Sequence, residues 1–280
     1  MSAFDVEEML LKNSELIEGA LDDLLPKGDA AYSVIYRAMR YSALGGGKRV
    51  RPTLTLEFCR LAGGKIEAAI PYAAAIECVH TYSLIHDDLP CMDNSDERRG
   101  RPSCHVAYGE ANALLAGDAL LTYAFSLAAE NPFADDGRNC RAVSVIANAA
   151  GFDGMIGGQV CDLIYEKSAP SFEDFMDMER GKTVELISAA CALGLVAARA
   201  DDDLFAAARK YAYCIGLSFQ IIDDILDGDE TGNTVLSYMS ADEAAATARD
   251  LTEEAKSAIC AYDGAQSLIA LADWLCGRKK

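Results

Sequence analysis

The sequence predicts an all-α protein. Apolar residues recur at the spacing of helical turns along almost the whole chain, and the alternating pattern of strands is missing. Only 7 of the 280 residues are proline, whereas Ala, Leu and Glu, which favour helices, are plentiful. No break between the apolar segments is long enough for a domain linker, so we expect one domain over residues 1–280.

The expected helices follow one another with short turns between them. Glycine and proline mark most of the breaks, as in Gly63-Gly64, Asn131-Pro132 and the Arg-Gly-Arg-Pro sequence at 99–102. The approximate ranges of the expected helices are 5–25, 30–43, 50–62, 67–88, 107–129, 138–165, 172–199, 202–228, 240–262 and 265–277.

Composition argues against several classes of protein. A formal net charge of −19 disfavours binding to the phosphate backbone of nucleic acids. The apolar stretch Ala189–Ala198 is far shorter than the roughly 20 residues that span a bilayer, so no transmembrane segment is expected. Acidic residues stand where a secretory signal would be basic, and the 10 cysteines include no CxxC pair. We therefore expect a cytoplasmic protein with reduced thiols.

Two aspartate clusters, each at the end of an apolar stretch, carry the strongest chemical signal. The first contains Asp87, Asp88 and Asp93. Pro90 disfavours helical geometry in the residue before it, so the first two aspartates should end a helix. Carboxylates this close repel one another, and leaving them unpaired near a core is costly. Mg²⁺ relieves both problems, and it typically bridges one or two carboxylates to substrate phosphates.

The second cluster contains Asp223, Asp224 and Asp227, and its spacing places all three carboxylates on one helix face. Gln220 lies one turn earlier on that face. The two clusters together predict a diphosphate held by several Mg²⁺ ions in a helical cavity. The alternative is a pair of solvated acidic helix ends, which are common on a chain of this charge.

Basic residues cluster in two places. A glycine turn at 45–47 is followed by Pro52 and by three cations that suit a phosphate at a helix start, namely Lys48, Arg49 and Arg51. Pro52 suits the first position of that helix. Arginines at 98, 99 and 101 follow the first aspartate cluster and could hold phosphate oxygens that the metals leave free. For each segment the alternative is an exposed surface turn.

Two further segments place glycine inside a helical pattern, at Gly157-Gly158 and at Gly181. Each such glycine costs about 1 kcal/mol against alanine, so either close packing or a functional site should explain it. The polar residues beside these glycines are Gln159, Asp162, Lys182 and Thr183. His80 stands two turns before Asp87 on the same helix face.

Together these segments resemble the trans-isoprenyl diphosphate synthases, in particular farnesyl diphosphate synthases of bacterial type. The resemblance covers nearly the whole chain in the expected order, through residues 46–52, 77–93, 98–100, 109–120, 157–162, 182–183 and 219–227. It implies an isoprenoid synthase-type helical bundle around a central cavity, and a homodimer. It also implies a reaction in which an allylic diphosphate ionises with Mg²⁺ on its leaving group, isopentenyl diphosphate attacks the cation, and a proton is lost.

The resemblance further implies a role for each matching residue. Three Mg²⁺ ions with substrate bound would be served by Asp87, Asp88, Asp93, Asp223, Asp224 and Asp227, with Asp87, Asp93 and Asp223 as the strongest direct ligands. The allylic substrate would be bound by Arg98, Lys182, Thr183 and Gln220. Isopentenyl diphosphate would be bound by Lys48, Arg51, His80 and Arg99, while Gln159 and Asp162 would line the site.

Tyr82, five positions before the first aspartate, would limit the length of the product by the same comparison. An aromatic side chain is a reasonable physical stop for a growing prenyl chain. The two-residue insertion Pro90-Cys91 also resembles synthases that make C15 farnesyl diphosphate. A C20 geranylgeranyl product remains open, because neighbouring side chains could move the stop.

The chain departs from the family after Asp227. Members carry a longer loop with a Gly-Lys and then a Lys-x-Thr-Tyr or Lys-x-Thr-Phe segment, whereas no Lys or Arg occurs here from Gly228 through Ala248. Gly232 or Asn233 stands where the first lysine is expected. Either the loop is truly shorter in this protein, which would give a catalytically weak homologue that acts as a partner subunit, or the sequence omits a mobile loop. A terpene cyclase is a third possibility, but it needs no second diphosphate pocket.

Overall fold

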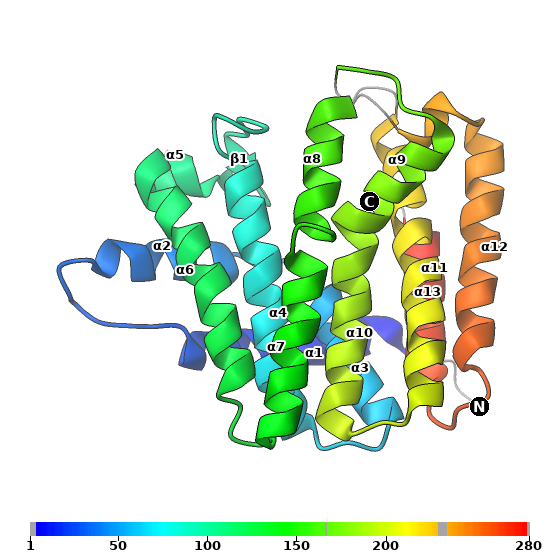
Figure 1. Cartoon of the computed structure of the whole chain (residues 1–280), viewed down its shortest axis with the longest axis horizontal. Helices are drawn as coiled ribbons and strands as arrows, with labels where there is room; N and C mark the ends of the chain where they lie inside the picture. Colours follow the sequence, from blue (N-terminus) through cyan, green and yellow to red (C-terminus); the bar gives the residue numbers. More distant parts are fainter. Residues whose placement is uncertain (1–3, 166, 229–233, 279–280) are drawn as a thin grey trace.

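The computed structural model describes residues 4–165, 167–228 and 234–278. Helices make up nearly all of the regular structure in this part of the chain, in agreement with the predicted all-α class (Figure 1). Their bounds are α1 Val6–Leu24, α2 Ser33–Ala43, α3 Val50–Leu61, α4 Ile66–Asp87, α5 Cys104–Tyr108, α6 Glu110–Ala129, α7 Asp136–Ala150, α8 Met155–Tyr165, α9 Phe172–Glu179, α10 Glu185–Ala198, α11 Asp202–Asp227, α12 Ala241–Ile259 and α13 Gln266–Gly277.

Three of the expected helices are interrupted. The range 107–129 divides at Gly109, whose φ of +83° suits glycine and ends α5 before α6 begins. The range 138–165 divides at residues 151–154, which separate α7 from α8. The range 172–199 stays helical but contains a π-helical turn, η1, at Arg180–Val184. Apolar spacing continues through all three interruptions, so the sequence pattern does not reveal them.

A short hairpin, which the sequence pattern did not predict, follows the first aspartate cluster. Strand β1 is Glu97–Arg98 and pairs antiparallel with β2, Arg101–Pro102. Its two turn residues, Arg99 and Gly100, have positive φ angles of 56° and 70°, as tight hairpins require. Strands of two residues are too short to produce a visible alternation of apolar and polar residues.

The core is built around α4 and α10, which are buried on almost every side. Helix α4 packs on α3, α6 and α10, and α10 also packs on α7 and α11. Figure 1 shows α4 and α11 both ending in the upper half of the view. The two aspartate clusters therefore lie at the same end of the bundle.

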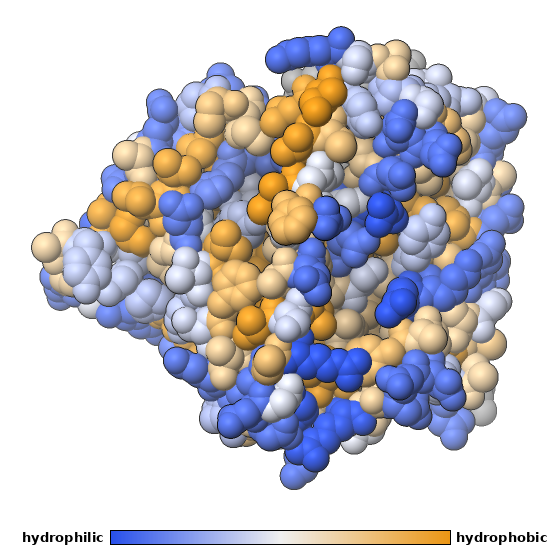
Figure 2. All heavy atoms as spheres, in the orientation of Figure 1, coloured by the Kyte–Doolittle hydropathy of each residue, from blue (hydrophilic) through white to orange (hydrophobic). Residues whose placement is uncertain are grey.

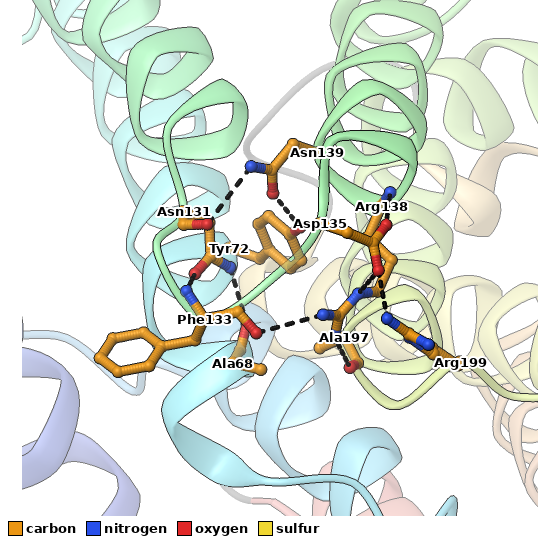
Figure 3. A network of polar contacts seen from close by, with 9 residues as sticks. All are labelled: Ala68, Tyr72, Asn131, Phe133, Asp135, Arg138, Asn139, Ala197 and Arg199. Carbon is orange, nitrogen blue, oxygen red and sulfur yellow. Dashed lines mark hydrogen bonds and ion pairs between the residues drawn. The ribbon is translucent and has the colours of Figure 1, made fainter.

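The opposite end of the bundle is tied together by polar contacts of the turn between α6 and α7 (Figure 3). Asn131 donates to the carbonyl oxygen of Ala68 at the start of α4 (2.9 Å), and Tyr72 donates to Asn139 on α7 (2.6 Å). Arg138 links this turn to the end of α10 by donating to the carbonyl oxygen of Ala197 (3.0 Å). These contacts fix α4, whose other end carries the first aspartate cluster, against α7 and α10.

Two helical stretches of the described chain are long and apolar enough to cross a bilayer, judged by length and composition. Within Phe172–Ala198, 72% of the 18-residue apolar window is buried inside the molecule, which identifies this stretch as part of the core. Within Glu110–Ala129, 39% of the corresponding window is buried, and the helix packs on α2, α4 and α7. The absence of a membrane span stays a prediction.

Candidate active site

The first aspartate cluster lies where α4 ends. The helix ends at Asp87 and Asp88 is its C-cap, as Pro90 predicts. The chain then folds back, because the backbone N–H of Asp93 donates to the carbonyl oxygen of Asp87 (2.9 Å). This turn brings Asp93 close to Asp87, and each carboxylate lies in the field of Lys182.

Asp88 points away from that pair and toward the hairpin. Its side chain is 3% exposed and accepts hydrogen bonds on both oxygens from Arg98, with Nε at 3.1 and 3.2 Å. A carboxylate engaged in this fork has little capacity left for a metal. The contact favours a role for Asp88 in positioning Arg98, rather than in binding Mg²⁺ directly.

The second cluster divides in the same way. Asp224 is buried, and its two oxygens accept from the backbone N–H of Val235 (2.7 Å) and from Gln220 (3.0 Å). Gln220 in turn accepts from the hydroxyl of Thr183 (3.3 Å). Asp224 therefore anchors a polar chain across the site. Asp227 is exposed one turn further along α11.

Asp223 is paired with Arg278, a residue that no sequence motif indicated. The Asp223 carboxylate lies 2.6 Å from the guanidinium, which also stacks on Phe219 at 3.7 Å and donates to the Phe219 carbonyl oxygen (2.7 Å). The Arg278 side chain is only 3% exposed. The end of α13 thus places a cation beside a predicted metal ligand.

Lys182 and Thr183 stand on the π-helical turn η1, where α8 crosses it at very short range. A Cβ atom on Gly158 would lie 2.2 Å from the backbone nitrogen of Lys182. Gly181 contacts the backbone of Gly158 in the same crossing. Close packing therefore explains these two glycines, and that packing fixes the two site residues that follow Gly181.

Lys182 forms an ion pair with Asp162 on α8. Burial opposes its charge, but Asp162 and the nearby Asp87 and Glu179 together raise the pKa of Lys182 above its ordinary value. Glu179, also missed by the sequence analysis, is 7% exposed at the start of the π turn. Burial, together with the nearby Asp224, raises the pKa of Glu179 to about 8. The sequence does not distinguish Glu179 from an exposed glutamate, because helical spacing does not show that its carboxylate is buried.

A cationic cavity of about 560 Å³ lies next to the second cluster. All four residues predicted to bind isopentenyl diphosphate line it, namely Lys48, Arg51, His80 and Arg99. Asp223 and Arg278 line it as well. Burial and the guanidinium groups of Arg51 and Arg99 hold the pKa of His80 well below its ordinary value, so its ring is neutral at neutral pH. The cavity is suited to an anion with several charged oxygens.

Arg49 also lines this cavity, but its charge is paired within the protein. Its guanidinium is fully buried, pairs with Glu77 on α4 and donates to the carbonyl oxygen of Ala43 (2.7 Å). Helix α3 begins at Val50, so Pro52 is its third residue rather than its first. The Nε atom of Arg51, like that of Arg49, is buried and has no hydrogen-bond partner within the described residues.

A second cavity of about 420 Å³ extends between α4 and α8. It shares Arg51, His80 and Thr183 with the cationic cavity, so the two adjoin. Asp87, Lys182 and Gln159 line it beside Tyr82 and a mostly apolar wall, formed by Met92, Met155, Ile156, Val160 and Leu163. Figure 2 shows apolar side chains gathered on the surface along α8, where Ile156 and Val160 are about half exposed.

Three carboxylates of the two aspartate clusters are unusually easy to protonate. Burial raises the pKa of Asp87 to about 6, and burial likewise raises the pKa values of Asp93 and Asp223. A buried carboxylate with a raised pKa gains from a cation that replaces the lost water. No group of three His, Cys, Asp or Glu side chains close enough to hold a metal alone exists among the described residues. The oxygen donors fit Mg²⁺ that is shared with a substrate diphosphate.

The predicted lysine position at Gly232 or Asn233 lies outside the described residues. The structure describes Gly228, which ends α11, and resumes at Thr234.

Comparison with known families identifies a match over most of the chain. The family model described as Polyprenyl synthetase matches residues 32–260.

Curated relatives and a solved structure agree with that match. The heterodimeric geranylgeranyl pyrophosphate synthase large subunit 1 of Arabidopsis thaliana is 40% identical over 99% of this chain and 81% of its own length. A geranylgeranyl diphosphate synthase of Cyanophora paradoxa is also 40% identical, over 98% of this chain and 97% of its own. The crystal structure of an FPP/GFPP synthase from Zymomonas mobilis has a TM-score of 0.92 at 35% identity and covers 97% of this chain and 99% of its own.

Proposed function

We propose that this chain, which belongs to the polyprenyl synthetase family and condenses isopentenyl diphosphate with allylic diphosphates, makes farnesyl diphosphate. The observation that carries the product assignment is the position of Tyr82. Its side chain is 5% exposed and lines the apolar cavity that also contains Asp87. A prenyl chain that grows into this cavity therefore meets an aromatic ring on the helix that binds its diphosphate.

The two aspartate clusters would hold the allylic diphosphate between them. Asp87, Asp93 and the exposed Asp227 remain available for Mg²⁺ after Asp88 and Asp224 are engaged. Asp223 would share its carboxylate between Mg²⁺ and Arg278. Mg²⁺ in this position would stabilise negative charge on the leaving diphosphate. Lys182 adds a cation beside Asp87, and Arg98, held by Asp88, adds a second one.

The cationic cavity would hold isopentenyl diphosphate. It adjoins the apolar cavity at Arg51, His80 and Thr183, so the alkene can lie next to the allylic carbon while both diphosphates stay on cationic side chains. The apolar wall keeps water from the allylic cation during the reaction. A terpene cyclase would have no use for this second diphosphate pocket.

Arg51→Ala should raise the KM for isopentenyl diphosphate by about tenfold to a hundredfold, since a charge-assisted hydrogen bond is worth about 1.5–3 kcal/mol. The KM for the allylic substrate should change much less. Steady-state kinetics with each substrate varied in turn checks this. An effect confined to the allylic substrate would reverse the assignment of the two pockets.

Tyr82→Ala should lengthen the product, because it removes the aromatic ring from the wall of the cavity. We expect C20 or longer diphosphates from isopentenyl diphosphate and geranyl diphosphate, measured by chromatography after dephosphorylation. Tyr82→Phe is the matched control, because it keeps the ring and should keep the C15 product. An unchanged product from the alanine variant would remove Tyr82 as the stop.

Geranylgeranyl diphosphate is the second candidate product, because both curated relatives described above are named geranylgeranyl synthases. Product analysis after incubation with dimethylallyl diphosphate, isopentenyl diphosphate and Mg²⁺ separates the two. A C15 end product supports the proposal. A C20 end product overturns it in favour of the second candidate.

A catalytically weak homologue that serves as a partner subunit stays the further alternative. The absence of Lys and Arg from Gly228 through Ala248 motivates it. Folded protein that binds Mg²⁺-diphosphate but makes no prenyl product in the same assay would establish it. A cytoplasmic homodimer stays a prediction.

A further inference from the structure

His86 lies between Tyr82 and helix α6, at the edge of the apolar cavity. It follows Tyr82 by one turn of α4, and the two rings meet edge to face with their centroids 5.7 Å apart. Both side chains line the cavity. Tyr82 has a buried hydroxyl without a hydrogen-bond partner in the described part of the chain, so packing alone holds its ring. The position of the Tyr82 ring therefore depends on its packing against His86.

His86 itself is held by α6. Its Nε2 lies 3.0 Å from the carbonyl oxygen of Leu114. A carbonyl oxygen can only accept, so Nε2 must carry the proton and donate. The carboxylate of Asp118 lies 3.9 Å from the same nitrogen and favours that arrangement. The imidazole is thus fixed to a second helix, whereas Tyr82 is not.

Gly117 provides the space for this contact. A Cβ atom at that position would lie 2.1 Å from Nε2 of His86 and 2.5 Å from its Cδ2. No other residue type would leave room for the ring against α6. The three nearest atoms to such a Cβ all belong to His86, so the glycine serves this side chain in particular.

We propose that His86, seated on Gly117 and bonded to Leu114, is a positioning residue that sets product length by holding the ring of Tyr82. The inference rests on the proposed function, and it assigns length control to a contact between α4 and α6 rather than to Tyr82 alone. A growing prenyl chain can displace the ring of Tyr82 only if His86 also moves away from Gly117.

His86→Ala tests the proposal with Tyr82 in place. The ratio of C20 to C15 product should rise by about tenfold or more, because small changes in an apolar pocket alter selection by that much. His86→Gln is the conservative control, since its amide can donate to the Leu114 carbonyl oxygen and should keep the ratio near that of the parent protein. A merely structural role would lower total yield in both variants and leave the ratio unchanged.

Gly117→Ala tests the seat without touching the cavity wall. It should lower the Tm and shift the ratio in the same direction as His86→Ala. Adding Gly117→Ala to His86→Ala should then have little further effect on either quantity, because the new methyl group meets only the imidazole. Gly19→Ala is a matched control, since a Cβ there meets nothing within 4 Å.

The outcomes separate two failures. Parent protein that makes no prenyl product contradicts the proposed function and, with it, this inference. Parent protein that makes C15 product while His86→Ala keeps the parent ratio contradicts this inference alone, as does a double variant whose Tm and ratio are the sums of the single effects.

Discussion

Replacing Asp87 by alanine is expected to lower turnover by about three orders of magnitude, because metal-assisted stabilisation of a leaving group is worth several kcal/mol. Asp87 lines the apolar cavity beside Lys182. Asp88 carries the contact with Arg98, so the change removes one carboxylate without breaking that pair. Single-turnover kinetics with saturating Mg²⁺ and both substrates measures the chemical step directly.

Asp223 requires a different substitution for the same test. Asp223→Ala would remove the partner of Arg278, whose side chain is 3% exposed, and would mix a loss of charge with a packing defect. Asp223→Asn keeps an oxygen that can accept from Arg278 and removes the charge that Mg²⁺ needs. We expect a loss similar to that of Asp87→Ala, with little change in Tm.

The control for both is Asp250→Ala, an exposed carboxylate on α12 that lies outside both cavities. It should keep the activity of the parent protein. Activity within a few-fold of the parent for either Asp87→Ala or Asp223→Asn would remove that residue from the metal site.

The first residue of each Asp-Asp pair lines a cavity and the second is buried against the protein, although the two residues look alike in the sequence. Successive residues on a helix point about 100° apart, so the two carboxylates of each pair point in different directions. Asp87 and Asp223 line the cavities, while Asp88 and Asp224 hold Arg98 and the start of the segment at Val235. Helix phase explains the division, and it can be read from a sequence only when the position of the cavity is known.

Local signals predicted the framework well. The apolar spacing located the helices, and Pro90 predicted where α4 ends, because both depend on neighbours in the chain. The same spacing failed at the π turn Arg180–Val184, where the helix continues with a different hydrogen-bond register. No apolar residue is displaced enough there to change the pattern.

The residues that the sequence did not predict act over long range. Arg278 reaches Asp223 from the end of α13, and no spacing rule joins those two positions. Arg49 and Arg51 look equivalent in the sequence, yet the guanidinium of Arg49 forms an ion pair with Glu77 of α4. Both outcomes depend on tertiary packing, which composition and periodicity do not contain.

Gly158→Ala is expected to have a large effect on activity, although Gly158 carries no functional group. A Cβ there would lie 2.2 Å from the backbone nitrogen of Lys182, so α8 and the π turn must separate. Lys182 and Thr183 would both move, and a displacement of about 1 Å in a positioning group can cost about a hundredfold in rate. Overpacking should also lower stability by about 1–3 kcal/mol.

Comparison with Gly19→Ala, whose Cβ meets nothing within 4 Å, separates local displacement from a general effect of replacing glycine. Kinetics and urea unfolding of both variants should show loss of rate and stability in Gly158→Ala only. The allylic substrate should be the more affected, because Lys182 stands beside Asp87 and not beside Lys48. A Gly158→Ala protein that is destabilised but turns over normally would mean that the crossing of α8 and the π turn holds the fold and not the cation.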